Sequence, residues 1–321
     1  MAGELSEIAE LAAGGLRTLR ELGQRIPVGG GVLAGSLHEA VRGRKILITG
    51  ASSGIGEATA LELADAGATV VLVARTRRAL RAVAAEAQGR GGTAFVHPCD
   101  LSDIEQVQRV AGEILERHGH VDILINNAGK SIRRSVDRSY ERFHDYQRTM
   151  ALNYFAPVRL VLSLLPVMRE RGFGHIVNVS TIGLQVNTPR FAAYLASKAA
   201  LDAFSRSIAP EVIGDGVHVT TVYMPLVRTP MTAPTRMYDR LPALSPQQAA
   251  HMICEAIRKR PKRVSTPLGS LGQLTYAIAP GAQDLVVNVA YKLFPEGDEP
   301  TDRRTEVEQR AFGRATPGVH W

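Results

Sequence analysis

"LITGASSGIG", residues 47–56, is the stretch of the sequence that decides the fold. An apolar segment runs here into a cluster of glycines and serines, and then into a helical pattern. A phosphate needs backbone N–H donors without a side chain in the way, and the N-terminus of a helix attracts it. The stretch therefore predicts a phosphate-binding turn, and an ordinary glycine-rich turn between strand and helix is the alternative. The residues expected to contact a nucleotide cofactor are Gly50, Ser52, Ser53, Gly54, Ile55 and Gly56.

Apolar segments and helical patterns alternate along the chain from residue 45. Short apolar runs predict buried strands at 45–49, 69–74, 93–98, 121–126, 175–180 and 217–224. Helical patterns lie between and after them, at about 56–66, 77–88, 103–118, 139–171, 191–213 and 246–260. This alternation predicts an α/β fold of the Rossmann type, with a doubly wound parallel sheet whose ligands bind at the carboxyl ends of the strands.

The two ends of the chain differ from this central pattern. Residues 4–26 carry apolar side chains at spacings of three and four, as an amphipathic helix does, and residues 268–294 predict two helices separated at Pro280 and Gly281. We expect one nucleotide-binding domain at 45–262, helical extensions at 1–44 and 263–294, and a polar tail at 295–321. The extensions are expected to pack on the domain or on a second subunit, with peripheral membrane contact as the alternative.

Composition and charge narrow the class of protein. The two cysteines, Cys99 and Cys254, exclude a disulfide framework and indicate a cytoplasmic protein. No uninterrupted apolar run approaches the ~20 residues that cross a bilayer, and the acidic N-terminus is unlike a secretory signal. The net charge is +7, but the basic residues are scattered apart from "RKRPKR" at 258–263. This favours a phosphate-bearing small molecule over nucleic acid, and no metal site is expected.

The end of the second predicted strand distinguishes between two cofactors. A site that prefers NAD usually ends this strand with a carboxylate, which binds the ribose 2′-hydroxyl. Here Ala74 is followed by Arg75, Thr76, Arg77 and Arg78. A guanidinium pairs with a 2′-phosphate, whereas a carboxylate would repel it. The sequence therefore predicts NADP(H), bound at Arg75 and Thr76, while Arg77 and Arg78 also fit a solvated helix start.

Tyr194 and Lys198, in "YLASK", lie four residues apart in a helical pattern and therefore on one face. Hydride transfer to a carbonyl needs an acid that protonates the developing alkoxide, and a phenol with a pKa near ~10 needs a cation to lower it. We expect the Lys198 ammonium to lower the pKa of Tyr194 and to reach the nicotinamide ribose. A surface pair without function is the alternative.

In these motifs the chain resembles the short-chain dehydrogenase/reductase family. "TGASSGIG" is similar to the family's cofactor turn, "NNAG" at 126–129 follows the fourth predicted strand, and "YLASK" matches the catalytic pair, in the family's order across about 45–260. The resemblance implies that Asp100 holds the adenine amine beside the Leu101 backbone. It also implies the roles of five further residues: Asn127, Ala128 and Gly129 line the adenosine side of the cofactor, and Val227 and Thr229 contact the nicotinamide amide.

The resemblance also implies two further catalytic groups. Asn153 would anchor a proton-relay water beside Lys198. The family's substrate-orienting serine corresponds by ungapped spacing to Thr181, and one inserted loop residue would make it Ser180, so both are retained as candidates. The family's usual Pro-Gly after the last strand is Pro225–Leu226 here, which changes the loop more than the chemistry.

Longer stretches, including residues 129–155, "FGHIVNV" and "YLASKAALDAFSR", are similar to the reductase domains of bacterial long-chain fatty acyl-CoA reductases. This implies hydride transfer from NADPH to a long-chain acyl-CoA thioester or a fatty aldehyde, with a homodimer or homotetramer as the assembly. Arg133, Arg134 or the basic run 258–263 could meet the phosphates of CoA. Ketones, β-ketoacyl chains and secondary alcohols are alternative substrates. A cofactor-binding scaffold or redox sensor is the non-enzymatic alternative, against which the intact Tyr194–Lys198 pair argues.

Overall fold

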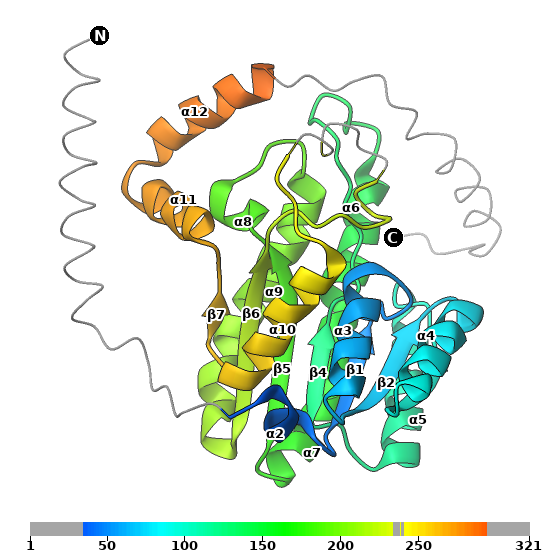
Figure 1. Cartoon of the computed structure of the whole chain (residues 1–321). Helices are drawn as coiled ribbons and strands as arrows, with labels where there is room; N and C mark the ends of the chain where they lie inside the picture. The colour runs from blue at the N-terminus through cyan, green and yellow to red at the C-terminus, as the bar shows by residue number, and fades with distance from the viewer. Residues whose placement is uncertain (1–34, 234–237, 239–240, 294–321) are drawn as a thin grey trace. The chain divides into compact units, whose positions relative to one another are not determined.

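The computed structural model describes residues 35–233, 238 and 241–293. The chain divides into two units, Met1–Ser36 and Leu37–Trp321, and the second contains a seven-stranded sheet in the order β3-β2-β1-β4-β5-β6-β7 (Figure 1). The strands are β1 Lys45–Thr49, β2 Thr69–Ala74, β3 Thr93–Pro98, β4 Ile123–Asn126, β5 Gly174–Thr181, β6 Val217–Met224 and β7 Arg263–Val264. All neighbouring strands pair in parallel, which confirms the predicted doubly wound sheet of the Rossmann type. The order reverses between β1 and β4, where such folds bind ligands.

Helices cover both faces of the sheet. They are α2 Leu37–Val41, α3 Gly54–Asp65, α4 Arg77–Gly89, α5 Ile104–His118, α6 Phe143–Met150, α7 Ala156–Glu170, α8 Gly183–Val186, α9 Ala192–Val212, α10 Pro246–Lys259, α11 Pro267–Ile278 and α12 Pro280–Leu293. Buried residues of α2, α3, α4 and α10 form one core cluster with the sheet, and those of α5, α7 and α9 form the other. In Figure 1, α3 and α10 lie on the face toward the viewer.

Strand β1 shows why the sequence forms such a sheet. Ile46 and Ile48 belong to the core on one face, and Leu47 between them belongs to the core on the other. All three side chains are fully buried. Because successive side chains of a strand point to opposite faces, a strand that is covered on both sides is an uninterrupted apolar run.

The segment that was predicted as one helix over 139–171 is built differently. Its helical part begins at Phe143, and a π-helical turn, Ala151–Phe155, separates α6 from α7. Turn hydrogen bonds precede it, from Ser139 N to the Val136 carbonyl and from Arg142 N to the Ser139 carbonyl, both at 2.9 Å. Among the described residues, Phe143–Glu170 is the one helical stretch that could cross a membrane by length and composition, yet α7 contributes Leu160, Leu164 and other side chains to the core.

The C-terminal helices α11 and α12 meet at Pro280, as the sequence predicted. Helix α11 packs closely against α8, and Gly269 and Gly272 make this approach possible. A Cβ on Gly269 would overlap the Gln185 side chain, and one on Gly272 would lie 2.7 Å from Val186 Cγ1. The sheet continues through β7, just past residue 262. The predicted amphipathic helix at 4–26 and the polar tail from 295 lie outside the described residues, and the domain boundaries stay predictions.

Candidate active site

The glycine-rich turn after β1 forms a cradle that has no room for side chains. Gly50 and Gly54 have φ values of +67° and +60°, which other residues rarely adopt. A Cβ on Gly50 would lie 2.9 Å from Ala128 Cα, and one on Gly56 would overlap the Gly50 carbonyl oxygen. Ser53 precedes α3 as an exposed residue that makes no side-chain cap hydrogen bond. The open helix N-terminus and the bare backbone fit a pyrophosphate.

Thr49, which the sequence reasoning missed, holds this turn to the end of β4. Its hydroxyl accepts hydrogen bonds from Asn127 N and Ala128 N, both at 3.0 Å, and donates to the Ile125 carbonyl at 3.2 Å. The Asn127 side chain, expected to line the cofactor, donates to the Thr49 carbonyl at 2.9 Å. It therefore fixes the turn itself. The "TG" pair before the serines was the signal that could have found Thr49.

The residues expected at the adenosine end follow β2 and β3 at the same edge of the sheet. Arg75 and Thr76 are exposed, and Thr76 is the N-cap of α4 without a side-chain cap hydrogen bond. Asp100 Oδ1 accepts hydrogen bonds from Ser102 N at 3.0 Å and from Ser102 Oγ at 2.6 Å. The Leu101 side chain is in the core, which leaves its backbone for a ligand.

Thr181 ends β5, and its hydroxyl lies close enough to the phenol of Tyr194 to lower the pKa of that phenol. The same hydroxyl accepts a hydrogen bond from Gly183 N at 3.1 Å. Lys198 lies one turn further along α9, is buried, and donates to the Val179 carbonyl at 2.8 Å. The structure therefore brings the hydroxyl, the phenol and the ammonium together at the carboxyl end of the sheet.

Ser180 occupies a different environment from its neighbour. Its side chain is 5% exposed, and its hydroxyl is buried without a hydrogen-bond partner among the described residues. Successive strand residues point to opposite faces of the sheet, so Ser180 and Thr181 cannot both face Tyr194. Of the two candidates, Thr181 is the one at the phenol.

Asn153 lies in the π-helical turn and is fully buried. Its amide nitrogen donates to the Lys130 carbonyl at 3.0 Å and to Ser197 Oγ at 2.9 Å, and its oxygen accepts from Lys130 N at 2.9 Å. Gly129 packs between this amide and the ammonium, since a Cβ there would lie 3.2 Å from Asn153 Oδ1 and 3.5 Å from Lys198 Nζ. Asn153 and Lys198 therefore lie on either side of Gly129. Ser197, which the sequence did not indicate, hydrogen-bonds Asn153.

The electrostatics differ from the sequence expectation. Burial raises the pKa of Tyr194 to about 12, and the nearby Thr181 hydroxyl opposes this only in part. Burial lowers the pKa of Lys198 to about 8. Desolvation of both groups therefore outweighs the expected acidification of the phenol by the ammonium, and that expectation is wrong for this arrangement. At neutral pH the phenol stays protonated and Lys198 stays mostly charged.

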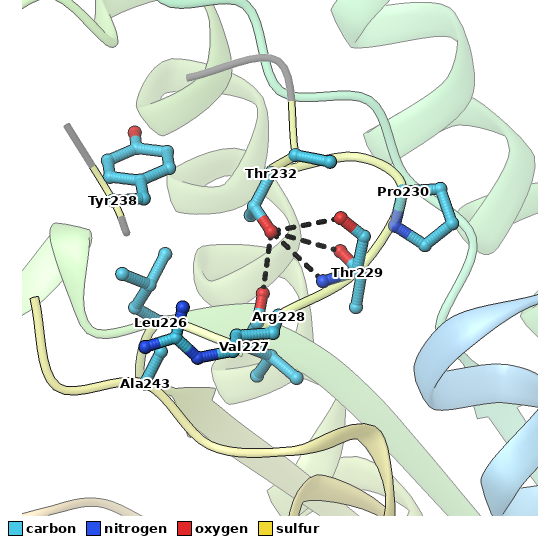
Figure 2. A pocket seen from close by; sticks show the side chains of 9 residues that line it. Leu226, Val227, Arg228, Thr229, Pro230, Thr232, Tyr238 and Ala243 are labelled. Atoms are coloured by element: carbon cyan, nitrogen blue, oxygen red, sulfur yellow. Dashed lines mark hydrogen bonds between the residues drawn. The ribbon is translucent and has the colours of Figure 1, made fainter. Parts of the chain in front are cut away.

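The loop after β6 closes the site on the side of the glycine turn. Gly54 faces Thr229, whose Cγ2 would lie 3.2 Å from a Cβ on Gly54. The Thr232 hydroxyl donates to the Val227 carbonyl at 2.8 Å and accepts from Thr229 N at 3.0 Å (Figure 2). The Val227 side chain is in the core, so only its backbone can meet a ligand. A pocket of about 320 Å³ opens on this loop and reaches Tyr238, whose pKa is raised by burial.

One set of basic residues expected to meet phosphates, the run 258–263, is placed elsewhere. Arg260 stacks on the ring of Phe173, before β5, together with Arg44, before β1, with guanidinium-to-centroid distances of 4.8 and 3.8 Å. The basic run 258–263 therefore lies toward the amino ends of the strands, away from the site, and that expectation is wrong. Arg133 lies near enough to Tyr238 of the pocket after β6 to act on the pKa of that phenol, and Arg134 Nε is ion-paired with Asp145 Oδ2 at 3.2 Å.

Known proteins with the same features were found by sequence and by structure. A family model described as short chain dehydrogenase matches residues 44–239. The chain is 51% identical to a fatty acyl-CoA reductase of Acinetobacter baylyi, over 88% of this chain and 97% of that protein. It is 53% identical to a fatty acyl-CoA reductase of Mycobacterium tuberculosis, over 70% of this chain and 76% of that one. The crystal structure of a metagenomic short-chain oxidoreductase in complex with NADP is similar, with a TM-score of 0.60, 30% sequence identity, and coverage of 71% of this chain and 100% of that one.

The chain belongs to the short-chain dehydrogenase/reductase family, and the resemblance inferred from its motifs is confirmed. It is an oxidoreductase of that family, acting on a small-molecule substrate.

Proposed function

We propose that this protein is an NADPH-dependent reductase of long-chain acyl-CoA thioesters, which it converts to fatty aldehydes with release of free CoA. The observation that carries the proposal is the placement of the Thr181 and Tyr194 hydroxyls near each other, beside a glycine cradle. The similarity to fatty acyl-CoA reductases over almost their full length supports the substrate class. The NADP complex of a structural relative supports the cofactor.

The cofactor would be held by residues that the structure leaves open. The backbone of Gly50, Gly54 and the first turn of α3 would bind the pyrophosphate, with the Ser52 and Ser53 hydroxyls. The exposed guanidinium of Arg75 would pair with the 2′-phosphate. When bound, the nicotinamide supplies the hydride.

The chain's own groups stabilise the oxyanion and supply the proton. The hydroxyls of Thr181 and Tyr194 donate hydrogen bonds to the thioester carbonyl oxygen, and this polarises it. As negative charge develops on that oxygen, Tyr194 transfers its proton to it, which gives a hemithioacetal. The hemithioacetal hydroxyl then gives up its proton as the C–S bond breaks, CoA leaves as the thiolate and takes up a proton, and the aldehyde remains. The raised pKa of Tyr194 keeps the phenol in the protonated form that this direction needs.

Lys198 and Asn153 support this step from behind. The ammonium favours the phenolate that remains after proton transfer, and Asn153 would anchor a water that returns a proton toward Lys198. The buried contacts of Gly129 with both groups support this relay.

The test is a substrate panel. The protein is incubated with NADPH or NADH and palmitoyl-CoA, an aliphatic aldehyde or a β-ketoacyl thioester, and both nucleotide oxidation and thiol release are recorded. The proposal requires NADPH oxidation with equimolar thiol from palmitoyl-CoA. Oxidation with the β-ketoacyl substrate and no thiol from palmitoyl-CoA would instead identify a ketone reductase.

We further propose that the protein is a cytoplasmic homodimer or homotetramer whose subunits contact each other through α7 and α9. We also propose that it makes peripheral contact with membranes. Leu162 on α7 and Ile213 at the end of α9 are 53% and 54% exposed, which supports pairing there. The exposed apolar residues of α11 and α12 support the membrane contact; they include Leu268, Ile278, Leu285 and Val286. Elution at the monomer mass at micromolar concentration would contradict the pairing, and failure to sediment with phospholipid vesicles would contradict the contact.

A further inference from the structure

A second pocket, of about 380 Å³, opens between the segments 135–140 and 188–192. The mechanism proposed above does not use it. Its walls come from three segments: the loop 135–140 after β4, the segment 188–192 that leads into α9, and Tyr291 of α12. The third wall is distinctive, because it comes from the C-terminal extension beyond the sheet.

One wall begins at the catalytic threonine. A Cβ on Gly183 would lie 3.3 Å from Thr181 Oγ1 and 3.4 Å from Thr188 Oγ1, so only the width of this glycine separates the hydroxyl from the pocket lining. Thr188 N also donates to the Gly183 carbonyl at 3.2 Å. Ala192 lines the pocket in the first turn of α9, which also carries Tyr194.

The opposite wall begins at the other catalytic groups. Its chain leaves Gly129 and Lys130, which contact Asn153 and Lys198. It then joins the first wall through a hydrogen bond from Arg134 N to the Arg190 carbonyl at 2.7 Å. Both walls therefore lead from the reacting carbonyl position outward into the same pocket.

Helix α12 closes the pocket through Arg190. The Arg190 guanidinium lies 4.0 Å from the centroid of the Tyr291 ring, and its Nη2 donates to the Tyr291 carbonyl at 3.0 Å. Arg190 has φ +69°, a left-handed conformation that is costly for a residue with a side chain. Its contacts with the loop and with α12 hold it there, so the position of Tyr291 is tied to the loop that leads to Tyr194.

The lining points to an apolar ligand. Val136, Tyr140, Pro189, Ala192 and the ring of Tyr291 supply most of it. Val136 and Tyr140 are 62% and 77% exposed, so apolar surface at this pocket stands in water until something covers it.

We propose that this pocket binds the hydrocarbon chain of the acyl thioester, and that Tyr291 of the C-terminal extension determines which chain lengths are preferred. This inference rests on the proposed function and adds to it the location of the acyl subsite. A chain that starts at Thr181 and Tyr194 and passes Thr188 reaches Tyr291 only when it is long, so the α12 wall acts on long chains more than on short ones.

The experiment compares octanoyl-, dodecanoyl- and palmitoyl-CoA with NADPH. Burial of one methylene is worth about a fourfold gain in binding, so the wild-type protein should show kcat/KM rising with chain length until the pocket is full. Tyr291→Ala is expected to lower kcat/KM for palmitoyl-CoA about tenfold more than for octanoyl-CoA, mainly through KM. Tyr276→Ala, which removes a 45% exposed tyrosine of α11 outside the pocket, is the matched control and should leave the ratio unchanged.

Ala192→Phe tests the same pocket by filling it, and should shift the preference toward octanoyl-CoA. Equal effects on all chain lengths in both variants would overturn the acyl subsite, even while thiol release by the wild-type protein upholds the proposed function. Without thiol release from any acyl-CoA, the proposed function fails. Calorimetric titration with the same three thioesters then decides the subsite: a length-dependent affinity that Ala192→Phe abolishes supports it, and a length-independent affinity overturns it.

Discussion

Replacing Thr181 by valine removes the hydroxyl at the phenol while keeping the shape of the side chain. Removal of one hydrogen-bond donor to a developing oxyanion costs roughly 10²–10³ in kcat, or about 3–4 kcal/mol. The substitution also leaves Gly183 N without the acceptor that it has at 3.1 Å, which costs about 1 kcal/mol in the free energy of unfolding. NADPH oxidation under saturating substrate measures the first effect and urea unfolding the second. Thr181→Ser keeps the hydroxyl and should restore most of the activity.

Ser180→Ala is the matched control on the neighbouring residue. The Ser180 hydroxyl is buried without a partner among the described residues, so its removal should raise the free energy of unfolding by up to about 1 kcal/mol and leave kcat within about twofold. If Ser180→Ala abolished the activity and Thr181→Val did not, the assignment of Thr181 would be refuted.

Three further predictions concern the ammonium, the cradle and the cofactor. Burial lowers the pKa of Lys198 from 10.5 to about 8, so the charged ammonium destabilises the folded state, and the free energy of unfolding should rise with pH between 8 and 10.5. Lys198→Met should raise the free energy of unfolding by about 1–2 kcal/mol and flatten this pH dependence. The same variant should abolish turnover. In wild-type protein, kcat should fall as pH rises through about 8, because the ammonium is lost. Gly56→Ala places a Cβ that would overlap the Gly50 carbonyl. It should lower the free energy of unfolding by about 1–3 kcal/mol, measured by urea unfolding, and weaken NADPH binding, measured by fluorescence titration. Arg75→Ala should reduce the preference for NADPH over NADH by about tenfold or more in kcat/KM, and an unchanged ratio would contradict 2′-phosphate recognition there.

Strands β1, β2, β4, β5 and β6 were predictable because each is buried on both faces. Runs such as "KILIT" and "TVVLVA" contain no turn residue, and their structural bounds agree with the predicted ones. The helical stretch before α7 was harder, because turns and helices share the same polar residues between 135 and 142. The short elements α2, α8 and β7 depend on tertiary contacts, and five or fewer residues carry no periodic signal.

The candidate site was predictable in its residues and only partly in its physics. Spacing indicated Tyr194 and Lys198, but burial, which decides their pKa values, is a property of the folded packing. The choice between Ser180 and Thr181 depended on where β5 ends, since a shift of one residue reverses the face of the sheet. Thr49 and Ser197 act through hydrogen bonds to distant segments. The "TG" pair could have indicated Thr49, whereas no sequence pattern indicates Ser197.

The π-helical turn at Ala151–Phe155 has a consequence for engineering this protein. A π turn holds one more residue than an α turn, so deleting one residue there would regularise the helix and improve its backbone hydrogen bonds. Because the extra residue is absorbed within the turn, the same deletion would leave α6 and α7 in their places and shift the side chains of the turn itself. Asn153 would then lose its hydrogen bonds with Lys130 and Ser197. A variant shortened at this turn should therefore be stable but lack the proton relay that Asn153 is proposed to hold.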